Sequence, residues 1–132
     1  MRLKALVWIV RPGPNGPQVL LLERPERRAG GEHPVTGKAD PGESPAAAAE
    51  REAFEETGLR GELVDLGYAH RYRGRRGEFE EHAFLLRVPP DATPVLSDEH
   101  SGYRWASEEA ARAATTNWHA HARALDLALK GF

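Results

Sequence analysis

The chain has 132 residues, of which 40% are hydrophobic and 29% are charged, and its formal net charge at pH 7 is −2. This length suits one domain with a substantial core, and the near-neutral charge provides no basic field that would attract nucleic acid. The sequence contains no cysteine, which excludes disulfides, thiol nucleophiles and thiolate metal sites.

The N-terminal part of the chain predicts a β-hairpin. Residues 3–10 have the composition of a buried strand, residues 19–22 form a return strand, and residues 12–17 between them are rich in proline and glycine. The first strand is too short for a membrane span and lacks the cleavage site of a secretory signal. We therefore expect a cytoplasmic protein that makes no contact with membranes.

Residues 23–31 predict a polar loop that leads into a short strand at residues 33–37. The arginines of this loop, Arg24 among them, are candidates for phosphate binding, although a solvated loop would have the same composition.

A helix is predicted over residues 45–57. Ser44 suits the N-cap, Pro45 suits the first helical position, and Gly58 suits the left-handed conformation that ends a helix. Within this helix, three carboxylates share one face because they stand at i, i+3 and i+4, namely Glu52, Glu55 and Glu56. Their mutual repulsion indicates either a solvated acidic face or a site for a hard cation such as Mg²⁺.

The second half of the chain predicts another hairpin, formed by residues 62–72 and 79–88 around a basic turn at residues 73–77. The tip carries four arginines that either contact a polyphosphate or keep the tip soluble, namely Arg71, Arg73, Arg75 and Arg76. Residues 91–96 predict a loop or a short strand, and residues 103–105 predict a strand.

Two helices are predicted near the C-terminus. Ser107 caps a short helix, and Asn117 is the expected cap of the last helix. The apolar positions of that helix recur at helical spacing, at Trp118, Ala122, Leu125 and Leu129. The order of strands and helices predicts an α/β fold with a mixed sheet between helices.

Residues 37–59 resemble the Nudix box, G-x5-E-x7-R-E-U-x-E-E-x-G-U, in which U is apolar. Each fixed position is filled at the family's spacing, by Gly37, Glu43, Arg51, Glu52, Glu55, Glu56, Gly58 and Leu59, while Ala53 is smaller than the usual aliphatic. The resemblance implies a single Nudix-type domain over residues 1–132, with an α/β/α sandwich and a loop–helix–loop motif. It also implies a pyrophosphohydrolase that acts on a nucleoside diphosphate linked to another group.

The resemblance further implies roles for individual residues. The expected ligands of Mg²⁺, or of Mn²⁺, are the Gly37 carbonyl, Glu43, Glu52, Glu55, Glu56 and Glu99. The expected catalytic group consists of Glu52, Glu55 and Arg51, with Glu52 as the first choice of general base and Arg51 as the residue that orients the carboxylates. Glu99 is a second candidate for the base, and Glu80 and Glu81 are weaker ones. Lys38, Arg24 and Trp118 are expected to bind substrate.

The six histidines show no zinc-binding spacing. His33 and His100 flank the expected site and are candidates for substrate contacts.

Two further stretches resemble the bacterial dihydroneopterin triphosphate pyrophosphatases: Pro34–Gly37, and Glu99-His100-x-x-Tyr103-x-Trp105 followed by a helix that carries Trp118. This resemblance implies cleavage of a nucleoside or dihydroneopterin triphosphate to the monophosphate and pyrophosphate. That group has an aromatic residue where Glu32 and His33 stand here. We therefore expect another aromatic residue to stack on the substrate ring, and the candidates are Tyr68, Tyr72, Tyr103 and Trp118.

Three alternatives remain open. Residues 77–84 resemble a strand of dinucleoside polyphosphate (Ap4A-type) hydrolases, whose substrates would suit the arginine-rich tip. A Nudix-like domain that binds nucleotides without cleaving them typically lacks a box glutamate, and every box glutamate is present here. An RNA 5′-pyrophosphohydrolase is disfavoured by the net charge.

Overall fold

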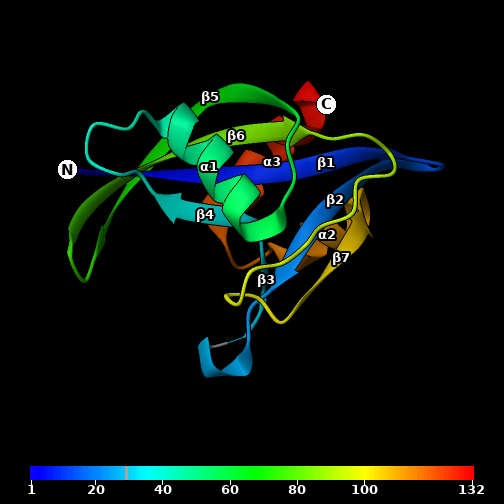
Figure 1. The fold of residues 1–132 in the computed structure, drawn as a ribbon, viewed down its shortest axis with the longest axis horizontal. Helices are drawn as coiled ribbons and strands as arrows, with labels where there is room; N and C mark the ends of the chain where they lie inside the picture. The colour runs from blue at the N-terminus through cyan, green and yellow to red at the C-terminus, as the bar shows by residue number, and fades with distance from the viewer. Residues whose placement is uncertain (29) are drawn as a thin grey trace.

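The computed structural model describes residues 1–28 and 30–132; Ala29, in the predicted polar loop, lies outside the described residues. A seven-stranded mixed sheet forms the centre of the molecule (Figure 1). Its strands are β1 (Arg2–Gly13), β2 (Gly16–Glu23), β3 (Glu32–His33), β4 (Val35–Lys38), β5 (Glu62–Gly74), β6 (Gly77–Arg87) and β7 (Gly102–Ser107). The main strand order is β3-β2-β1-β6-β5, while β4 pairs with β1 and β7 pairs with β2.

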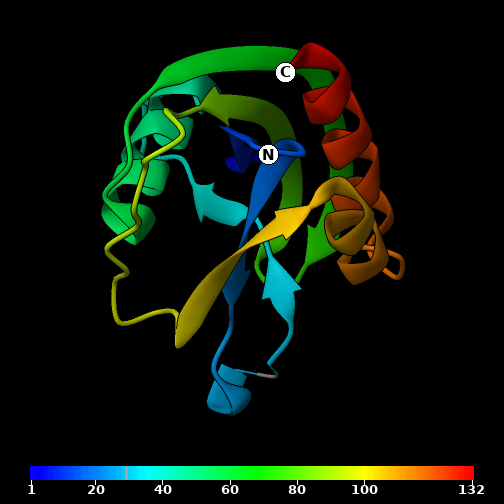
Figure 2. The same ribbon diagram turned by 90° about the vertical axis from the view of Figure 1, so that its right-hand side faces the viewer.

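Helices cover both faces of this sheet. They are α1 (Pro45–Thr57), α2 (Glu108–Ala114) and α3 (His119–Gly131), and a short 3₁₀ helix, η1 (Glu26–Arg28), follows β2. Figure 2 shows α1 on one side of the sheet and α2 and α3 on the other. The predicted α/β sandwich with a mixed sheet is therefore confirmed.

The central strand β1 supplies side chains to both cores, because alternate residues of a strand point to opposite faces. Ala5, Val7 and Ile9 pack in one core with the buried alanines of α1. Leu6, Trp8 and Val10 pack in the other core with α2, α3 and β7.

Both predicted hairpins form. Strands β1 and β2 pair antiparallel around a turn between Gly13 and Gly16, and β5 and β6 pair antiparallel around a turn between Gly74 and Gly77. Strands β1 and β6 run parallel, which makes the sheet mixed.

The single strand predicted at residues 33–37 is divided at Pro34, because proline has no N–H to donate to a ladder. Before this residue β3 pairs with β2, and after it β4 pairs with β1. The chain thus changes partner strand immediately before the start of the Nudix-like motif.

Helix α1 has the predicted bounds. The Ser44 hydroxyl accepts a hydrogen bond from the Ala47 N–H at 3.1 Å, and Gly58 has a φ of 70°, in the left-handed region. The acidic face is consequently presented as the sequence predicts.

The start of α3 differs from the prediction. Trp118, not Asn117, occupies the N-cap position, and it makes no side-chain cap hydrogen bond. Its backbone N–H donates to the Thr115 carbonyl at 2.9 Å, so the turn before the helix extends one residue further than expected. The Ser107 cap of α2 is confirmed by a hydrogen bond from the Ala110 N–H at 3.1 Å.

Residues 91–96 form a loop without a strand, and this loop passes the C-terminal end of α1. Among the described residues, no helix is both long enough and apolar enough to cross a membrane.

Candidate active site

Arg51 joins the carboxylates of the motif. Its Nε and Nη2 each donate to one oxygen of Glu43 at 2.9 Å, and its Nη1 donates to Glu52 Oε1 at 2.8 Å and to Glu55 Oε2 at 3.2 Å. The hydrogen bonds from this guanidinium lower the pKa of Glu43 to about 2. Arg51 also donates to the Lys38 carbonyl at 2.9 Å, so the same side chain fixes the loop before α1.

Gly37 lies directly against Glu52. A Cβ atom at position 37 would collide with the carboxyl group of Glu52, so the close approach of β4 to α1 requires glycine here. This contact explains why a glycine stands fifteen positions before that glutamate in the motif.

Glu56 is a buried carboxylate, with 3% of its surface exposed. Its Oε2 has no hydrogen-bond partner among the described residues. Burial raises the pKa of Glu56 to about 9, and the neighbouring carboxylates of Glu52 and Glu99 act in the same direction. A buried carboxylate surrounded by other carboxylates fits a divalent cation, because such an ion would satisfy its free oxygen and offset the repulsion.

The loop before β7 brings two further residues to Glu56. It is tied to the end of α1 by the Val95 N–H, which donates to the Thr57 carbonyl at 2.8 Å, and by the Ser97 N–H, which donates to the Glu56 carbonyl at 3.3 Å. Glu56, Glu99 and His100 each place one potential ligand atom within 4.8 Å of the others. Glu99, forty residues beyond the end of the box, thus lies beside Glu56, and its role as a metal ligand stays a prediction.

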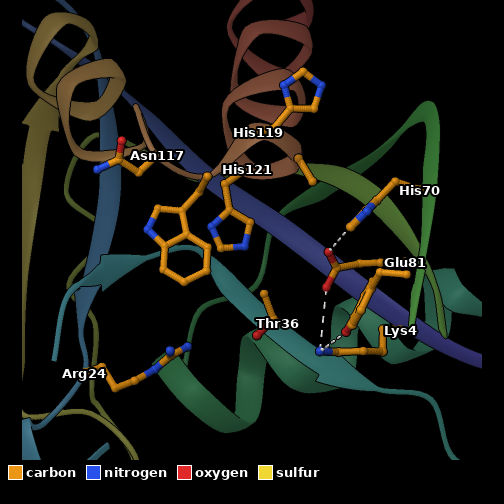
Figure 3. A pocket seen from close by; sticks show the side chains of 11 residues that line it. Lys4, Arg24, Thr36, His70, Glu81, Asn117, His119 and His121 are labelled. Carbon is orange, nitrogen blue, oxygen red and sulfur yellow. Dashed lines mark hydrogen bonds and ion pairs between the residues drawn. The ribbon is translucent and has the colours of Figure 1, made fainter. Parts of the chain in front are cut away.

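A pocket of about 360 Å³ opens on the α3 side of the sheet (Figure 3). This volume falls within the roughly 300–1,000 Å³ typical of small-molecule sites. Six separate segments supply its walls, which are formed by Lys4, Arg24, Thr36, His70, Tyr72, Glu81, Asn117, Trp118, His119, Ala120 and His121.

Trp118 and the Glu81–Lys4 pair line different parts of this pocket. The Trp118 ring stacks on His121 with centroids 5.4 Å apart, and 54% of Trp118 is exposed. On the opposite wall in Figure 3, Glu81 Oε1 lies 2.8 Å from His70 Nε2, and its Oε2 lies 3.8 Å from Lys4 Nζ. The pocket thus offers a flat apolar surface together with one buried carboxylate and one ammonium group.

Arg24 connects the pocket to the carboxylate cluster. Its side chain lines the pocket. The pKa of His33 is lowered to about 3, mainly by burial and next by the positive charge of Arg24. The same charge also contributes to the lowered pKa of His100 and of His121. The guanidinium of Arg24 is therefore within electrostatic range of both regions.

The other predicted substrate contacts occupy different places. Of the four candidates for ring stacking, Tyr72 and Trp118 line the pocket, whereas Tyr68 and Tyr103 do not. The Lys38 ammonium lies 5.7 Å from the centroid of the Phe79 ring. At the hairpin tip, Arg71 pairs with Glu80 at 2.9 Å and Arg73 pairs with Glu78 at 3.1 Å.

Lys4, His70 and His121 were not predicted to be parts of a pocket. These residues lie on β1, β5 and α3, and only the packing of α3 against the folded sheet brings them together. A charged residue at a position of a strand that faces inward would have indicated such a pocket, and Glu81 is a residue of this kind.

Comparisons with known proteins agree with this fold. A family model described as "NUDIX domain" matches residues 2–128. An octanoyltransferase from Myxococcus xanthus is 42% identical over 111 residues, which amount to 80% of this chain but 30% of that protein. The chain therefore spans less than a third of the length of this curated relative.

Solved structures share the same architecture. An Ap4A hydrolase from C. elegans superposes with a TM-score of 0.83 and 23% identity, over 100% of both chains. The dihydroneopterin triphosphate pyrophosphohydrolase of E. coli gives a TM-score of 0.81 and 24% identity, over 98% of this chain and 96% of that one. The NUDIX domain of Shewanella oneidensis NrtR, complexed with ADP ribose, gives a TM-score of 0.75 and 16% identity, over 98% of this chain and 86% of that one. At these identities the likeness concerns the fold alone.

Proposed function

The chain belongs to the NUDIX family, and we propose that it hydrolyses a phosphoanhydride bond of a nucleoside or dihydroneopterin triphosphate, releasing the monophosphate and pyrophosphate. Family membership supports the predicted enzyme class, a Nudix pyrophosphohydrolase. One observation carries the proposal: a buried glutamate with a free oxygen, Glu56, lies among other carboxylates, and Arg24, which lines the ring-sized pocket, acts electrostatically on His33 and His100 beside this cluster. We further propose that residues 1–132 form one domain whose motif spans residues 37–59.

The residues of the cluster have the donor chemistry that Mg²⁺ or Mn²⁺ requires. Glu52 and Glu56 would be the principal ligands, supported by Glu43, Glu55, Glu99 and the Gly37 carbonyl. Such an ion, when bound, neutralises phosphate oxygens and lowers the pKa of a coordinated water.

In the proposed reaction, water adds to a phosphorus atom of the anhydride, one P–O bond breaks, and pyrophosphate leaves. Glu52 takes the proton of the attacking water, and Arg51 positions Glu52 through its Nη1 hydrogen bond. Glu99 is the second candidate for this base, since it lies beside Glu56.

The ring of the substrate would lie in the pocket of Figure 3, against Trp118. Arg24 would bind the phosphates that run from this pocket to the carboxylates. Lys38 remains a candidate for a second phosphate contact.

A dinucleoside polyphosphate is the second candidate substrate. Its extra phosphates would need cationic partners at the β5–β6 tip, and two of the four arginines there already pair with glutamates. Replacing Arg73, Arg75 and Arg76 by alanine should raise the KM for such a substrate steeply, and an unchanged KM would remove this candidate.

Octanoyl transfer is not part of the proposal. This chain corresponds to less than a third of the Myxococcus protein, and the NUDIX model covers nearly all of the residues of this chain.

The proposal is tested by incubating the protein with Mg²⁺ or Mn²⁺ and separate substrates, followed by chromatography of the products. The panel holds dihydroneopterin triphosphate, dNTPs, ADP-ribose, diadenosine polyphosphates and a short 5′-triphosphate RNA. Pyrophosphate released from a small triphosphate supports the proposal, and ATP released from a diadenosine polyphosphate moves it to the second candidate. Binding without turnover of any compound would favour a nucleotide-binding module.

A further inference from the structure

Two histidines adjoin the carboxylate cluster at a separation typical of metal ligands. His33 Nε2 and His100 Nε2 lie 3.1 Å apart, and His100 Nε2 lies 3.6 Å from Glu56 Oε1. The side chains of His100 and Glu56 are each only 4% exposed, and His33 is buried. These groups come from β3, from the loop before β7 and from α1, so the fold assembles them from three distant segments.

The proton position on His33 follows from its second ring nitrogen. His33 Nδ1 lies 2.6 Å from the Pro34 carbonyl oxygen. A carbonyl oxygen can only accept a hydrogen bond, so Nδ1 carries the proton and donates it. The neutral ring then has its lone pair on Nε2, which faces His100. Donation from the second nitrogen to a backbone carbonyl is the usual arrangement of a metal-binding imidazole.

The distance between the two Nε2 atoms suits a shared ion. With metal–nitrogen bonds of about 2.0–2.1 Å, two ligands lie about 2.9 Å apart at a right angle and about 3.4 Å apart at the tetrahedral angle. The observed separation of 3.1 Å lies between these values.

A hydrogen bond between the two imidazoles is the competing explanation of that distance. In this arrangement His100 Nε2 would donate to His33 Nε2. It would leave Glu56 Oε2 buried without a partner among the described residues, whereas a bound ion would satisfy this oxygen; His100 Nδ1 lacks a partner in either arrangement. An unsatisfied buried polar atom costs about 1–3 kcal/mol, so this alternative gives no reason for the buried Glu56 carboxylate beside the histidines.

We propose that His33, His100 and Glu56, with Glu99 at the solvent side, form a binding site for a divalent transition-metal ion. Imidazole nitrogen favours ions such as Mn²⁺, Co²⁺ or Zn²⁺ over Mg²⁺, which prefers oxygen donors and keeps several waters. The site shares Glu56 and Glu99 with the proposed active site but does not rest on the proposed hydrolysis, because an ion binds these donors whether or not any phosphoanhydride is cleaved.

The test is the binding of Mn²⁺ and Co²⁺ to the full chain without substrate. Electron paramagnetic resonance of bound Mn²⁺ should show coupling to imidazole nitrogen, and labelling the histidines with ¹⁵N should change that coupling. Co²⁺ should bind with the visible absorption of a nitrogen-ligated ion. These measurements use the wild-type protein, so they do not depend on any variant folding correctly.

Variants then assign the donors. His100→Gln and His33→Gln should each weaken Co²⁺ binding by roughly tenfold or more, whereas the control His82→Gln, on β6 beside Glu80, should bind Co²⁺ as the wild type does. Circular dichroism and thermal melts check that each variant is folded. Bound Mn²⁺ without nitrogen coupling, or unchanged Co²⁺ affinity in a folded His100→Gln variant, would overturn the proposal. If the protein hydrolyses a phosphoanhydride while its bound Mn²⁺ shows no coupling to nitrogen, the histidine site is overturned and the proposed function still holds.

Discussion

Gly37 and Glu52 are packed so closely that one added methyl group on Gly37 would collide with the carboxyl group of Glu52. The contact joins β4 to α1, and it places the expected general base where Arg51 donates to its Oε1 at 2.8 Å. The glycine at the start of the motif is thus needed for the position of a carboxylate, as well as for the course of the backbone.

Gly37→Ala tests this relationship. The alanine should displace the Glu52 carboxylate, which is the far end of a flexible side chain, and leave the fold intact. Because a displacement of about 1 Å in a catalytic group costs on the order of 100-fold, kcat should fall by about that factor. The control is Gly102→Ala, where a Cβ atom meets no atom closer than 3.8 Å. Equal melting temperatures with unequal turnover in steady-state assays confirm the prediction; full activity of Gly37→Ala contradicts it.

Arg51→Gln should remove the guanidinium group that donates hydrogen bonds to Glu43, Glu52 and Glu55. Loss of an orienting residue typically costs 10–100-fold in activity or metal affinity, and we expect that loss in kcat. In the same variant the pKa of Glu43 should rise from about 2 towards the ordinary value of 4.5, which carbon-detected NMR titration of the carboxyl group measures. Arg112→Gln, which removes exposed ion pairs to Glu108 and Asp126, should retain activity.

Trp118→Ala should raise KM because stacking of a base on an aromatic ring contributes about 1–3 kcal/mol. We expect an increase of about tenfold with a smaller change in kcat. Tyr103→Ala is the control, since Tyr103 is 40% exposed yet lies outside the pocket. Equal effects of the two substitutions on KM in initial-rate measurements would show that the substrate ring does not stack on Trp118.

The lowered pKa of His121 predicts that the folded chain loses stability as the pH falls. Burial lowers the pKa of His121 below its ordinary value of 6.5, so below pH 6.5 the unfolded chain takes up a proton that the folded chain resists. The contribution to stability is complete above pH 6.5 and is lost as the pH falls towards the lowered pKa. Melting temperatures between pH 7.5 and 5.5 should fall less for His121→Gln than for the wild type. The exposed His119→Gln should follow the wild type, and a wild-type slope for His121→Gln would refute the linkage.

The motif and its helix were predictable because their signals are local. Ser44, Pro45 and Gly58 determine the ends of α1 within a few residues of sequence, and the spacing of Glu52, Glu55 and Glu56 determines the acidic face. The same local reasoning failed at Asn117, because the turn before α3 depends on a backbone hydrogen bond from Trp118 to Thr115.

The remainder of the site depends on contacts between distant segments. Glu99 was expected from a resemblance, but the contact between His100 and Glu56 depends on a loop that is tied to the end of α1. The pocket likewise joins Lys4 of β1 to Glu81 of β6. No periodicity within a single strand or helix encodes such pairs.

The most direct test of the account is the turnover of Glu56→Gln beside the wild type, with Mg²⁺ and the best substrate of the panel. Glutamine keeps the shape of this buried side chain and removes its charge, so we expect kcat to fall by about 100-fold or more. The melting temperature in EDTA should stay at or above that of the wild type, because a carboxyl group whose pKa burial raises to about 9 is costly to ionise in the folded state. Wild-type turnover in a folded Glu56→Gln variant would contradict the assignment of this carboxylate cluster as the metal-dependent catalytic centre.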